Sequence, residues 1–539
     1  MEEQVVIGKG TWMDKVAHNL IKREKKLGRS LDLVTVESGL GASGIPHIGS
    51  MADAVRAYGI VLALGNLGFK SELIAYSDDM DGLRKIPHGL PHWLQDYIAK
   101  PVSSIPDPFG SCHASYGEHM SNLLLEGLDK AGIKYRFQSS REAYQKGILI
   151  NQIDTILKNS SKLGQMIARL VGQEKYIEVL PYFPICHNCG RLYTAVAQEY
   201  VSTKKKVAYI CQGSKIGKVD IEGCGTKGEA DITKCEGKLA WKVEFAARWQ
   251  ALDIRFEGYG KDIMDSVKVN DWISDEILTY SHPMHIKYEM FLDKTGKKIS
   301  KSAGNVLTPQ MWLKYGTAES ILLLLFKRIT GTRHVALEDV PTLMDEYDYY
   351  EDIYFGKISE DNVAKLNKIK GIYEYVNKLN PPKRPDTHIP YQFIAQQASI
   401  FPISSDRDEK VFNRLVKYGM VKQKTESVMQ KIRLACNWSD DNIMKDEKFE
   451  VPLSNSHRKA VQDLIEALRP FAGLPDTPNN AKDLQSTVFS TARSNNIEPK
   501  EFFILLYRMF LNADRGPRIG NYFLDLGIDR AISILHKYL

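Results

Sequence analysis

The chain has 539 residues, 43% of them hydrophobic, and its 72 basic and 66 acidic residues leave a formal net charge of +6. This length and apolar content predict three or four domains with separate cores, and the small basic excess permits a nucleic-acid partner without requiring one. Seven cysteines without an export signal argue against a disulfide framework, and no apolar run reaches the roughly 20 residues of a membrane span. We therefore expect a cytoplasmic protein that uses no membrane.

The N-terminal part predicts an amphipathic helix and then an anion-binding loop. Residues 11–28 have helical periodicity with a solvated basic face, and the β-branched run at 33–36 predicts a strand. The small residues at 42–50 lead from that strand into a predicted helix at 51–64. Such a loop presents backbone N–H groups and the positive end of the helix dipole to an anion. His47, in the first turn, adds a side-chain donor that suits a phosphate.

The next predicted strand, Leu73–Tyr76, is followed by the acidic segment Ser77–Pro87. The alternation of strands and helices over residues 31–94 is typical of the first half of a doubly wound parallel sheet. Ligands of such sheets bind beyond the carboxyl ends of the strands, so we expect the acidic segment at the same edge as His47. Its aspartates are candidates for binding a cationic substrate, although Asp78 and Asp79 could instead cap a helix.

Residues 100–239 break this alternation and contain most of the cysteines. Cys186 and Cys189 form a Cys-x₂-Cys knuckle, and Cys211 and Cys224 follow it. Four thiolates from two loops fit tetrahedral zinc, although the twelve residues between Cys211 and Cys224 exceed the spacing of a usual second knuckle. Cys235 could replace either of these two, and the alternative to a zinc site is a set of unliganded buried thiols.

A second candidate metal cluster lies in Pro106–His119. Asp107, Cys112, His113 and His119 supply a carboxylate, a thiolate and two imidazoles, all of which are acceptable zinc ligands. The Pro/Gly turns of this stretch could bring them together. The alternative is a Cys-His pair with a purely structural role.

Residues 240–310 return to strand-and-helix patterning and carry a lysine-rich segment, Lys298–Ser302. We interpret it as a loop that brings positive charge to a polyphosphate. From residue 312 the pattern becomes helical, with an apolar core helix predicted at 320–326. The Pro-rich stretch Asn380–Pro385 marks the clearest domain boundary.

The two loops, Ala42–Ser50 and Lys298–Ser302, closely resemble the HIGH and KMSKS motifs of class I aminoacyl-tRNA synthetases. Either motif alone is weak evidence, because an ordinary helix cap or a solvated lysine loop has the same composition. Their order and separation strengthen the pair. Five further segments are similar to those of the class I lysyl-tRNA synthetases found in most archaea and some bacteria: Ser77–Pro87, Gly237–Glu244, Glu257–Asp262, Tyr347–Gly356 and Gly516–Gly520.

The resemblance implies an α/β fold: a Rossmann-like doubly wound catalytic domain with a zinc-binding insertion, followed by a mostly α-helical C-terminal anticodon-binding domain. The implied bounds are 1–99 and 240–310 for the halves of the catalytic domain, 100–239 for the acceptor-stem insertion, 311–385 for a helical linker and 386–539 for the anticodon-binding domain. Arg515, Arg518 and Tyr522 are candidate anticodon contacts, with helix-end packing as the alternative.

The resemblance also implies ATP-dependent ligation of L-lysine to tRNA(Lys) through a lysyl-adenylate, carried out by a monomer with Mg²⁺ and Zn²⁺. The implied catalytic residues are His47, Lys298 and Lys301. Those implied for ATP are Ser43, Gly44, His47, Gly49, Ser50, Lys298, Ser300 and Lys301. A pocket for lysine is expected from Ser38, Asp79 and Asp81, completed by Trp241, Glu244 and Tyr288 on later strands.

Three other functions compete with this interpretation. A glutamyl enzyme of the same class would want arginine in its substrate pocket, whereas the loop after Tyr76 offers three aspartates. A non-catalytic zinc-ribbon RNA-binding paralogue has no need of His47, Lys298 and Lys301. A nucleotidyltransferase for a small molecule has no need of so long a helical C-terminal region.

Overall fold

The computed structural model describes residues 6–217, 219–289, 291–297, 299, 307–401, 403–442, 449–475, 477–511, 514 and 516–539. Lys298, Ser300, Lys301 and Arg515 lie outside these residues. The chain forms two compact units. The first unit comprises Met1–Trp312, Ile321–Leu337 and Gly356–Pro382, and the second comprises Leu313–Ser320, Glu338–Phe355 and Lys383–Leu539. The last change between them falls within the predicted Pro-rich boundary.

The core of the first unit is a five-stranded sheet in which all neighbouring strands are parallel. Its strands are β1 (Val34–Leu40), β2 (Ser71–Ser77), β3 (Arg136–Ser139), β11 (Ile254–Gly260) and β12 (Met284–Tyr288), in the order β12-β11-β1-β2-β3. The expected doubly wound parallel sheet is therefore confirmed. Strand order reverses between β1 and β11, which places a ligand crevice at their carboxyl ends. The fifth strand, β3, comes from residues expected in the insertion.

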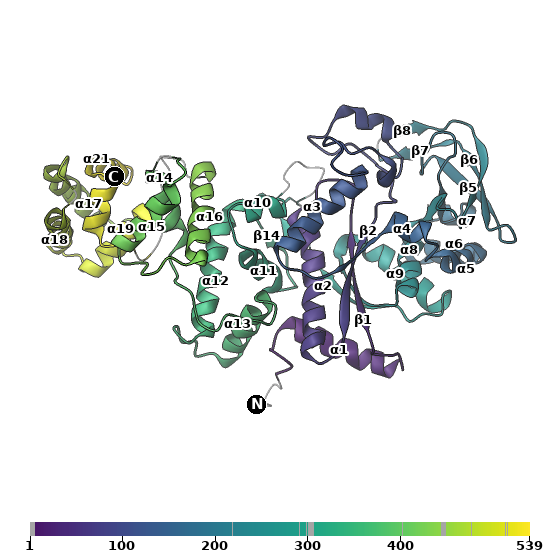
Figure 1. The fold of residues 1–539 in the computed structure, drawn as a ribbon, viewed down its shortest axis with the longest axis horizontal. Coiled ribbons are helices and arrows are strands. Elements are labelled where there is room, and N and C mark those ends of the chain that lie inside the picture. Colours follow the sequence, from purple (N-terminus) through teal and green to yellow (C-terminus); the bar gives the residue numbers. More distant parts are fainter. Residues whose placement is uncertain are drawn as a thin grey trace. The chain divides into compact units, whose positions relative to one another are not determined.

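Helices cover the sheet on both sides, with α2 on one side of β1 and β2 and α8 and α9 on the other (Figure 1). The helices around the sheet are α1 (Trp12–Lys26), α2 (Ile48–Asn66), α3 (Tyr116–Lys130), α8 (Trp241–Ala251) and α9 (Met264–Glu276). A capping box begins α1, since Thr11 accepts from the Asp14 N–H and Asp14 accepts from the Thr11 N–H. By length and composition α2 could cross a membrane, but 67% of its apolar window is buried inside the protein, as expected of a core helix.

The prediction that Trp241 and Glu244 lie on strands is wrong, because both lie in the first turn of α8. The sequence Trp-Lys-Val-Glu alternates apolar and polar residues, which imitates a strand. The following turns are buried on nearly every side, from Val243 to Trp249. A helix enclosed on all sides lacks the 3.6-residue periodicity that would have identified it.

Small antiparallel sheets fill the remainder of the predicted insertion. They are β4 (Tyr182–Pro184) with β10 (Gly237–Leu239), β5 (Ala195–Val201) with β6 (Lys206–Cys211) and β9 (Lys227–Asp231), and β7 (Gly213–Ile216) with β8 (Val219–Glu222). The accompanying helices are α4 (Ser140–Gln145), α5 (Ile150–Lys158), α6 (Ser160–Val171) and α7 (Lys175–Glu178). One apolar cluster joins these elements, apart from β7 and β8, to α8 and α9, so most of the insertion shares a core with the central sheet.

The remaining elements are mostly helical, as predicted. The elements near the points where the chain passes from one unit to the other are β13 (Phe291–Leu292), α10 (Pro309–Leu313), α11 (Ala318–Phe326), β14 (Arg333–His334), α12 (Val340–Tyr354) and α13 (Val363–Val376). The core helix expected at 320–326 is confirmed, since Ile321, Leu322 and Leu323 are fully buried in α11. Further along are α14 (Tyr391–Ile400), α15 (Arg407–Lys417), α16 (Glu426–Asn442), α17 (Asn455–Leu468), α18 (Pro478–Ser494), α19 (Pro499–Leu511), α20 (Ile519–Leu526) and α21 (Ile528–His536).

Candidate active site and metal centres

A cavity of about 370 Å³ lies at the carboxyl ends of β1 and β11, where the sheet topology predicts a ligand. Strand ends, the loop at 42–50, α2 and α8 all contribute to it. Among the predicted site residues, it is lined by Ser43, His47, Gly49, Ser50, Trp241 and Tyr288. Gly44 belongs to the same loop but is buried and outside the lining.

His47 is the N-cap of α2, where its Nδ1 accepts from the Ser50 N–H at 3.3 Å. In the neutral imidazole this leaves the ring proton on Nε2, which is then a donor. Gly49 provides the room for the ring, because a Cβ there would lie 2.8 Å from His47 Cε1. The loop is further held by Tyr116, whose hydroxyl donates to the Ser43 carbonyl at 3.0 Å. The first signature thus holds the His47 ring at the N-terminus of α2, where the sequence predicts an anion site.

The second signature contributes to the same cavity through Ile299, its one residue that the structure describes. Ile299 lines the cavity, and the Leu307 carbonyl accepts from the Ile48 N–H at 2.8 Å. The sequence predicts that His47, Asp79 and Lys301 meet at this sheet edge: His47 lines the cavity together with Ile299, whereas Asp79 does not line it. Lys298, Ser300 and Lys301 remain predictions, because they lie outside the described residues.

A buried charge cluster forms the floor of the cavity around Arg248, which is 1% exposed at its side chain. Its guanidinium lies 2.8 Å from Glu37, 2.9 Å from Asp78 and 3.4 Å from Glu257. Burial raises the pKa of Asp78 to about 7, against the lowering effect of Arg248, and burial likewise raises the pKa of Glu37. Three carboxylates thus share one guanidinium, so this floor of the cavity has more negative than positive groups.

A second buried cluster centres on Lys238, whose ammonium lies 2.5 Å from Asp81 and 2.8 Å from Glu244. The same Asp81 oxygen accepts from the Trp241 indole N–H at 3.2 Å, and Glu244 accepts from the Tyr144 hydroxyl at 2.9 Å. Both carboxylates are therefore already bound to protein groups. Asp81 fixes the Trp241 ring that lines the cavity.

Two further residues of the expected lysine pocket are buried and do not belong to the cavity lining. Asp79 accepts from the Ser139 hydroxyl at 2.5 Å and from the Arg141 N–H at 2.8 Å. Ser38 is 3% exposed within β1. The described lining includes neither of them, nor Asp81 or Glu244, so the structure brings only Trp241 and Tyr288 of that predicted set to the cavity.

Sequence reasoning missed Asp53 and Arg56, which line the cavity from α2. Burial raises the pKa of the Asp53 carboxyl to about 7, against the lowering effects of the neighbouring Tyr288 and Arg56, and the Tyr288 hydroxyl donates to the Gly258 carbonyl at 3.5 Å. The Arg56 guanidinium lies 4.6 Å from the Tyr288 ring centroid and 5.3 Å from that of Phe291. The signal was present, because charged residues are out of place in the apolar helix after His47.

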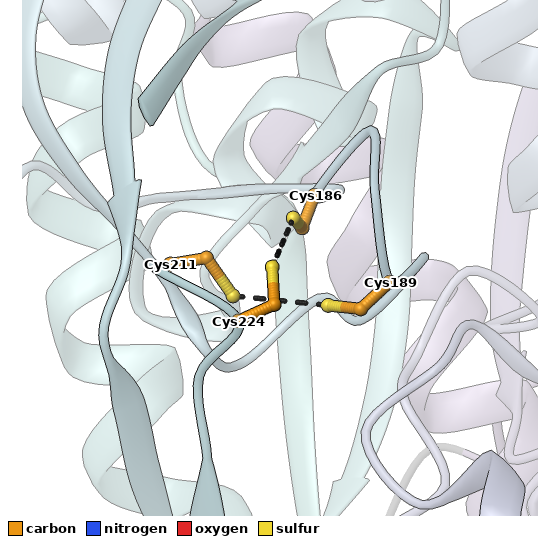
Figure 2. Close-up of side chains that lie close together, drawn as sticks. All are labelled: Cys186, Cys189, Cys211 and Cys224. Carbon is orange, nitrogen blue, oxygen red and sulfur yellow. Dashed lines mark hydrogen bonds between the residues drawn. The ribbon is translucent and has the colours of Figure 1, made fainter. Parts of the chain in front are cut away.

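The four cysteines of the first predicted metal cluster lie together, with all sulfur atoms within 4.8 Å of one another (Figure 2). Cys186 Sγ lies 3.5 Å from Cys224 Sγ, and Cys189 Sγ lies 3.7 Å from Cys211 Sγ. Zn–S bonds of about 2.3 Å in a tetrahedron require sulfur atoms about 3.8 Å apart, so this donor set fits zinc. The hairpin β7–β8 spans the wide gap between Cys211 and Cys224 and returns the chain to the cluster.

Cys235 does not replace any of these ligands. Its sulfur lies 3.9 Å from Met80 Sδ and from the Arg141 carbonyl, which is a different environment. That alternative from the sequence is wrong.

The second predicted cluster also comes together, since one donor atom from each of its four residues lies within 4.8 Å of the others. Cys112 Sγ lies 3.2 Å from Asp107 Oδ2, 3.2 Å from His113 Nδ1 and 3.3 Å from His119 Nδ1. The two histidine Nδ1 atoms are 3.1 Å apart. Mixed N, O and S donors at these separations also fit tetrahedral zinc. His119 lies in the first turn of α3, which also carries Tyr116 to the Ser43 carbonyl.

A family model described as "tRNA synthetases class I (K)" matches residues 10–379, which is more than half of the chain. The chain belongs to this class I tRNA synthetase family. A protein from Cenarchaeum symbiosum (strain A) named lysine–tRNA ligase is 52% identical over 539 residues, which is 100% of both chains. A second Cenarchaeum symbiosum protein of that name is 51% identical and covers 99% of each chain. One from Rickettsia bellii is 28% identical over 94% of this chain and 93% of its own.

For this synthetase, the family match covers the whole parallel sheet and the cavity at its edge. It ends at residue 379, just before the Pro-rich stretch, whereas the 52% identical relative continues through the helical C-terminal region. Neither a small-molecule nucleotidyltransferase nor a non-catalytic RNA-binding protein is favoured by these matches.

Proposed function

We propose that this synthetase joins L-lysine to tRNA(Lys) through a lysyl-adenylate, with release of diphosphate and then AMP. The observation that carries the proposal is that one cavity is lined both by His47, at the start of α2, and by the carboxyl group of Asp53. The name of the full-length relatives agrees with it. Charging of tRNA(Lys) with radiolabelled lysine tests it directly: lysine-dependent charging is expected, and charging with glutamate would favour the rival enzyme.

In the first step, a carboxylate oxygen of lysine attacks the α-phosphorus of ATP, and the bond to the bridging oxygen breaks as diphosphate leaves. His47 Nε2–H would donate to the phosphate oxygens as charge shifts, and the positive end of the α2 dipole would favour them, although the Ile48 and Ser50 N–H groups are already bonded to the Leu307 carbonyl and to His47. Ser43, Gly49 and Ser50 would line the nucleotide. In the second step the 2′-hydroxyl of the terminal adenosine attacks the mixed anhydride, and AMP leaves.

The charge of the cavity explains a need for cations. Its described lining carries five carboxylates but only two guanidinium groups: Asp53, Asp78, Glu257, Asp262 and Glu289 against Arg56 and Arg248. A polyphosphate would be repelled there unless positive charge accompanied it. Mg²⁺ together with Lys298 and Lys301 would supply that charge, with Ser300 beside them.

For the substrate lysine we propose a revised pocket. Asp53, beside Tyr288, would accept the ammonium group, and the Trp241 ring would pack on the methylenes. An arriving cation offsets the desolvation that raises the Asp53 pKa, so binding and ionisation support each other. Asp81 then acts as a positioning residue for Trp241, while Asp79, Glu244 and Ser38 support the wall.

Replacing Asp53 by asparagine is expected to raise KM for lysine about 10- to 100-fold, since it removes a charge-assisted hydrogen bond of about 1.5–3 kcal/mol. The wild-type KM should fall as pH rises through about 7, where Asp53 ionises and lysine stays an ammonium ion. The variant should lose that dependence. Steady-state charging at pH 6–8 measures both effects. Asp32→Asn, an exposed site before β1, is the control; an equal rise there would contradict the assignment.

We further propose that each four-residue cluster holds one Zn²⁺. Cys186, Cys189, Cys211 and Cys224 would hold one ion, and Asp107, Cys112, His113 and His119 the other. Four protein ligands leave no open coordination position, so both metals would be structural. The first would fasten the β7–β8 hairpin to the knuckle, and the second would order the turn before α3 and thereby Tyr116.

Replacing Cys186 by alanine is expected to lower the zinc content by one ion per chain and to reduce thermal stability by several degrees, because metal binding contributes folding energy. Metal analysis by mass spectrometry and a melting curve measure the two effects. Cys235→Ala, in the same region but outside the cluster, should leave both unchanged. A wild-type protein without zinc, or a Cys186 variant with a full complement, would contradict the proposal.

The tRNA partner, a monomeric state and a place in the cytoplasm complete the proposal. Within the helical region proposed to read the anticodon, Tyr522 is 2% exposed and its ring lies 6.0 Å from that of Phe510. This favours the packing interpretation for Tyr522, so we leave it out of the anticodon contacts. Arg518, the residue before α20, is exposed and remains in the proposal.

A further inference from the structure

The second unit contains a histidine that lies between two carboxylates of one helix. His388 Nε2 lies 2.6 Å from Glu351 Oε2, and His388 Nδ1 lies 3.0 Å from Asp352 Oδ1. The histidine side chain is only 15% exposed, and that of Glu351 is 4% exposed. Both carboxylates belong to the last turn of α12, within the segment Tyr347–Gly356, to which the function proposed above gives no role.

The two contacts of this ring require that it carry a positive charge. A neutral imidazole has one N–H, so it can donate to only one of the two carboxylates, whereas an imidazolium donates to both. Although burial lowers the pKa of His388, the hydrogen bond to Glu351 and the nearby carboxylates of α12 raise it above its ordinary value. Geometry and charge therefore agree on an imidazolium.

The charged groups around the ring come from three elements. α12 also carries Asp345 and Asp348, and α16 contributes Lys431, which pairs with Asp348. Asp386 adds a carboxylate from the segment of the histidine itself. Burial raises the pKa of Asp345 to about 6 and also raises that of Asp348, while Lys431 lowers both. Among the described residues at this place carboxylates outnumber cations, so the charge of His388 offsets a negative excess.

The same helix holds the backbone on either side of His388. The Asp386 N–H donates to the Glu351 carboxylate at 2.9 Å, and the Tyr391 N–H donates to the Asp345 carboxylate at 2.8 Å. Between α12 and this segment the chain runs through residues 356–382, which belong to the first unit. The contacts therefore join the residues that precede this excursion of the chain to those that follow it.

We propose that His388, Glu351 and Asp352 form a clasp that holds residues 386–391 on α12 and loosens when the imidazolium loses its proton. Because the pKa of His388 is raised in the folded state, its contribution is complete below the unfolded value of about 6.5 and is lost as pH rises through the higher folded value. Ionisation of Asp345 acts in the same direction at lower pH, because its folded pKa of about 6 also lies above its unfolded value.

Hydrogen–deuterium exchange of the full-length protein, followed by mass spectrometry, tests the clasp. The readout is protection of the peptide that covers residues 384–391, corrected for the pH dependence of an unprotected amide. Protection in wild type should fall about 10- to 100-fold between about pH 6 and pH 9, as one charge-assisted hydrogen bond is lost. His388→Gln, whose side chain stays neutral, should show the lower protection at every pH. In Glu351→Gln the midpoint of the fall should move to lower pH, because the carboxylate that stabilises the imidazolium is gone.

His457→Gln is the matched control, because His457 also pairs with a glutamate of the second unit, Glu501 at 3.0 Å, outside the clasp. It should leave both the protection and its midpoint unchanged, and an equal effect there would overturn the assignment to His388. Wild-type protection that does not depend on pH would overturn the titrating role. Full protection of His388→Gln at pH 6 would overturn the clasp itself.

Discussion

Replacing Arg248 by methionine should lower the free energy of unfolding of the first unit by about 3–5 kcal/mol and abolish measurable aminoacylation. The side chain is 1% exposed and neutralises Glu37, Asp78 and Glu257, which come from β1, the loop after β2, and β11. Methionine keeps much of the packing volume but leaves these carboxylates buried without a counter-charge. Chemical denaturation followed by tryptophan fluorescence measures the loss, since Trp249 donates to Glu257 in the same cluster.

The pH dependence of that loss has a definite sign. Without Arg248, the pKa values of Glu37 and Asp78, which burial already raises, move even further above their unfolded values, so the folded variant binds more protons than the unfolded chain. Its stability must therefore rise as pH falls through the range in which Asp78, with a pKa already raised to about 7 by burial, takes up its proton. The double variant Glu37→Gln, Arg248→Met should recover part of the stability. A single variant as stable and active as wild type would contradict this role.

Replacing His47 by alanine should lower the maximal rate of ATP–diphosphate exchange about 10²- to 10³-fold, with little change in KM for lysine. A positioned donor that meets developing charge contributes an effect of this size. Alanine also removes the N-cap that Nδ1 provides to the Ser50 N–H, at a cost of about 1 kcal/mol. Exchange kinetics and a melting curve separate the two contributions.

Asparagine at position 47 is the matched variant, because its side chain retains the cap but is too short to replace Nε2. His47→Asn should therefore melt close to wild type and be as slow as His47→Ala. If the asparagine variant regained wild-type exchange, the role of His47 would be structural rather than catalytic.

The local structure of the proposed anion site could be predicted from the sequence because its determinants are local. A strand, small residues and His47 at a helix start fix where the backbone N–H groups point, and Gly49 is needed within two residues of the ring it accommodates. The cysteine cluster could also be predicted from the sequence, because cysteines with knuckle spacing in a long chain have few roles other than metal binding. No sequence pattern indicated the β7–β8 hairpin, which spans the residues between Cys211 and Cys224.

The substrate pocket could not be predicted in the same way, because it depends on which buried charges pair. Asp81 and Asp79 follow a strand end, as a substrate ligand would, but Lys238 and the Ser139 hydroxyl already occupy them. Those partners lie far along the chain and are set by tertiary packing. Asp53 gave a weaker signal in sequence, and its assignment rests on the contact with Tyr288 on β12.

The central claim is that one cavity activates lysine with ATP, and ATP–diphosphate exchange measured with each amino acid in turn tests it most directly. The zinc-loaded protein should exchange label with lysine, either alone or when tRNA(Lys) is added. Exchange with glutamate in place of lysine would contradict the lysine pocket while leaving the family unchanged. No exchange with any amino acid, from folded protein with tRNA present, would contradict catalysis itself.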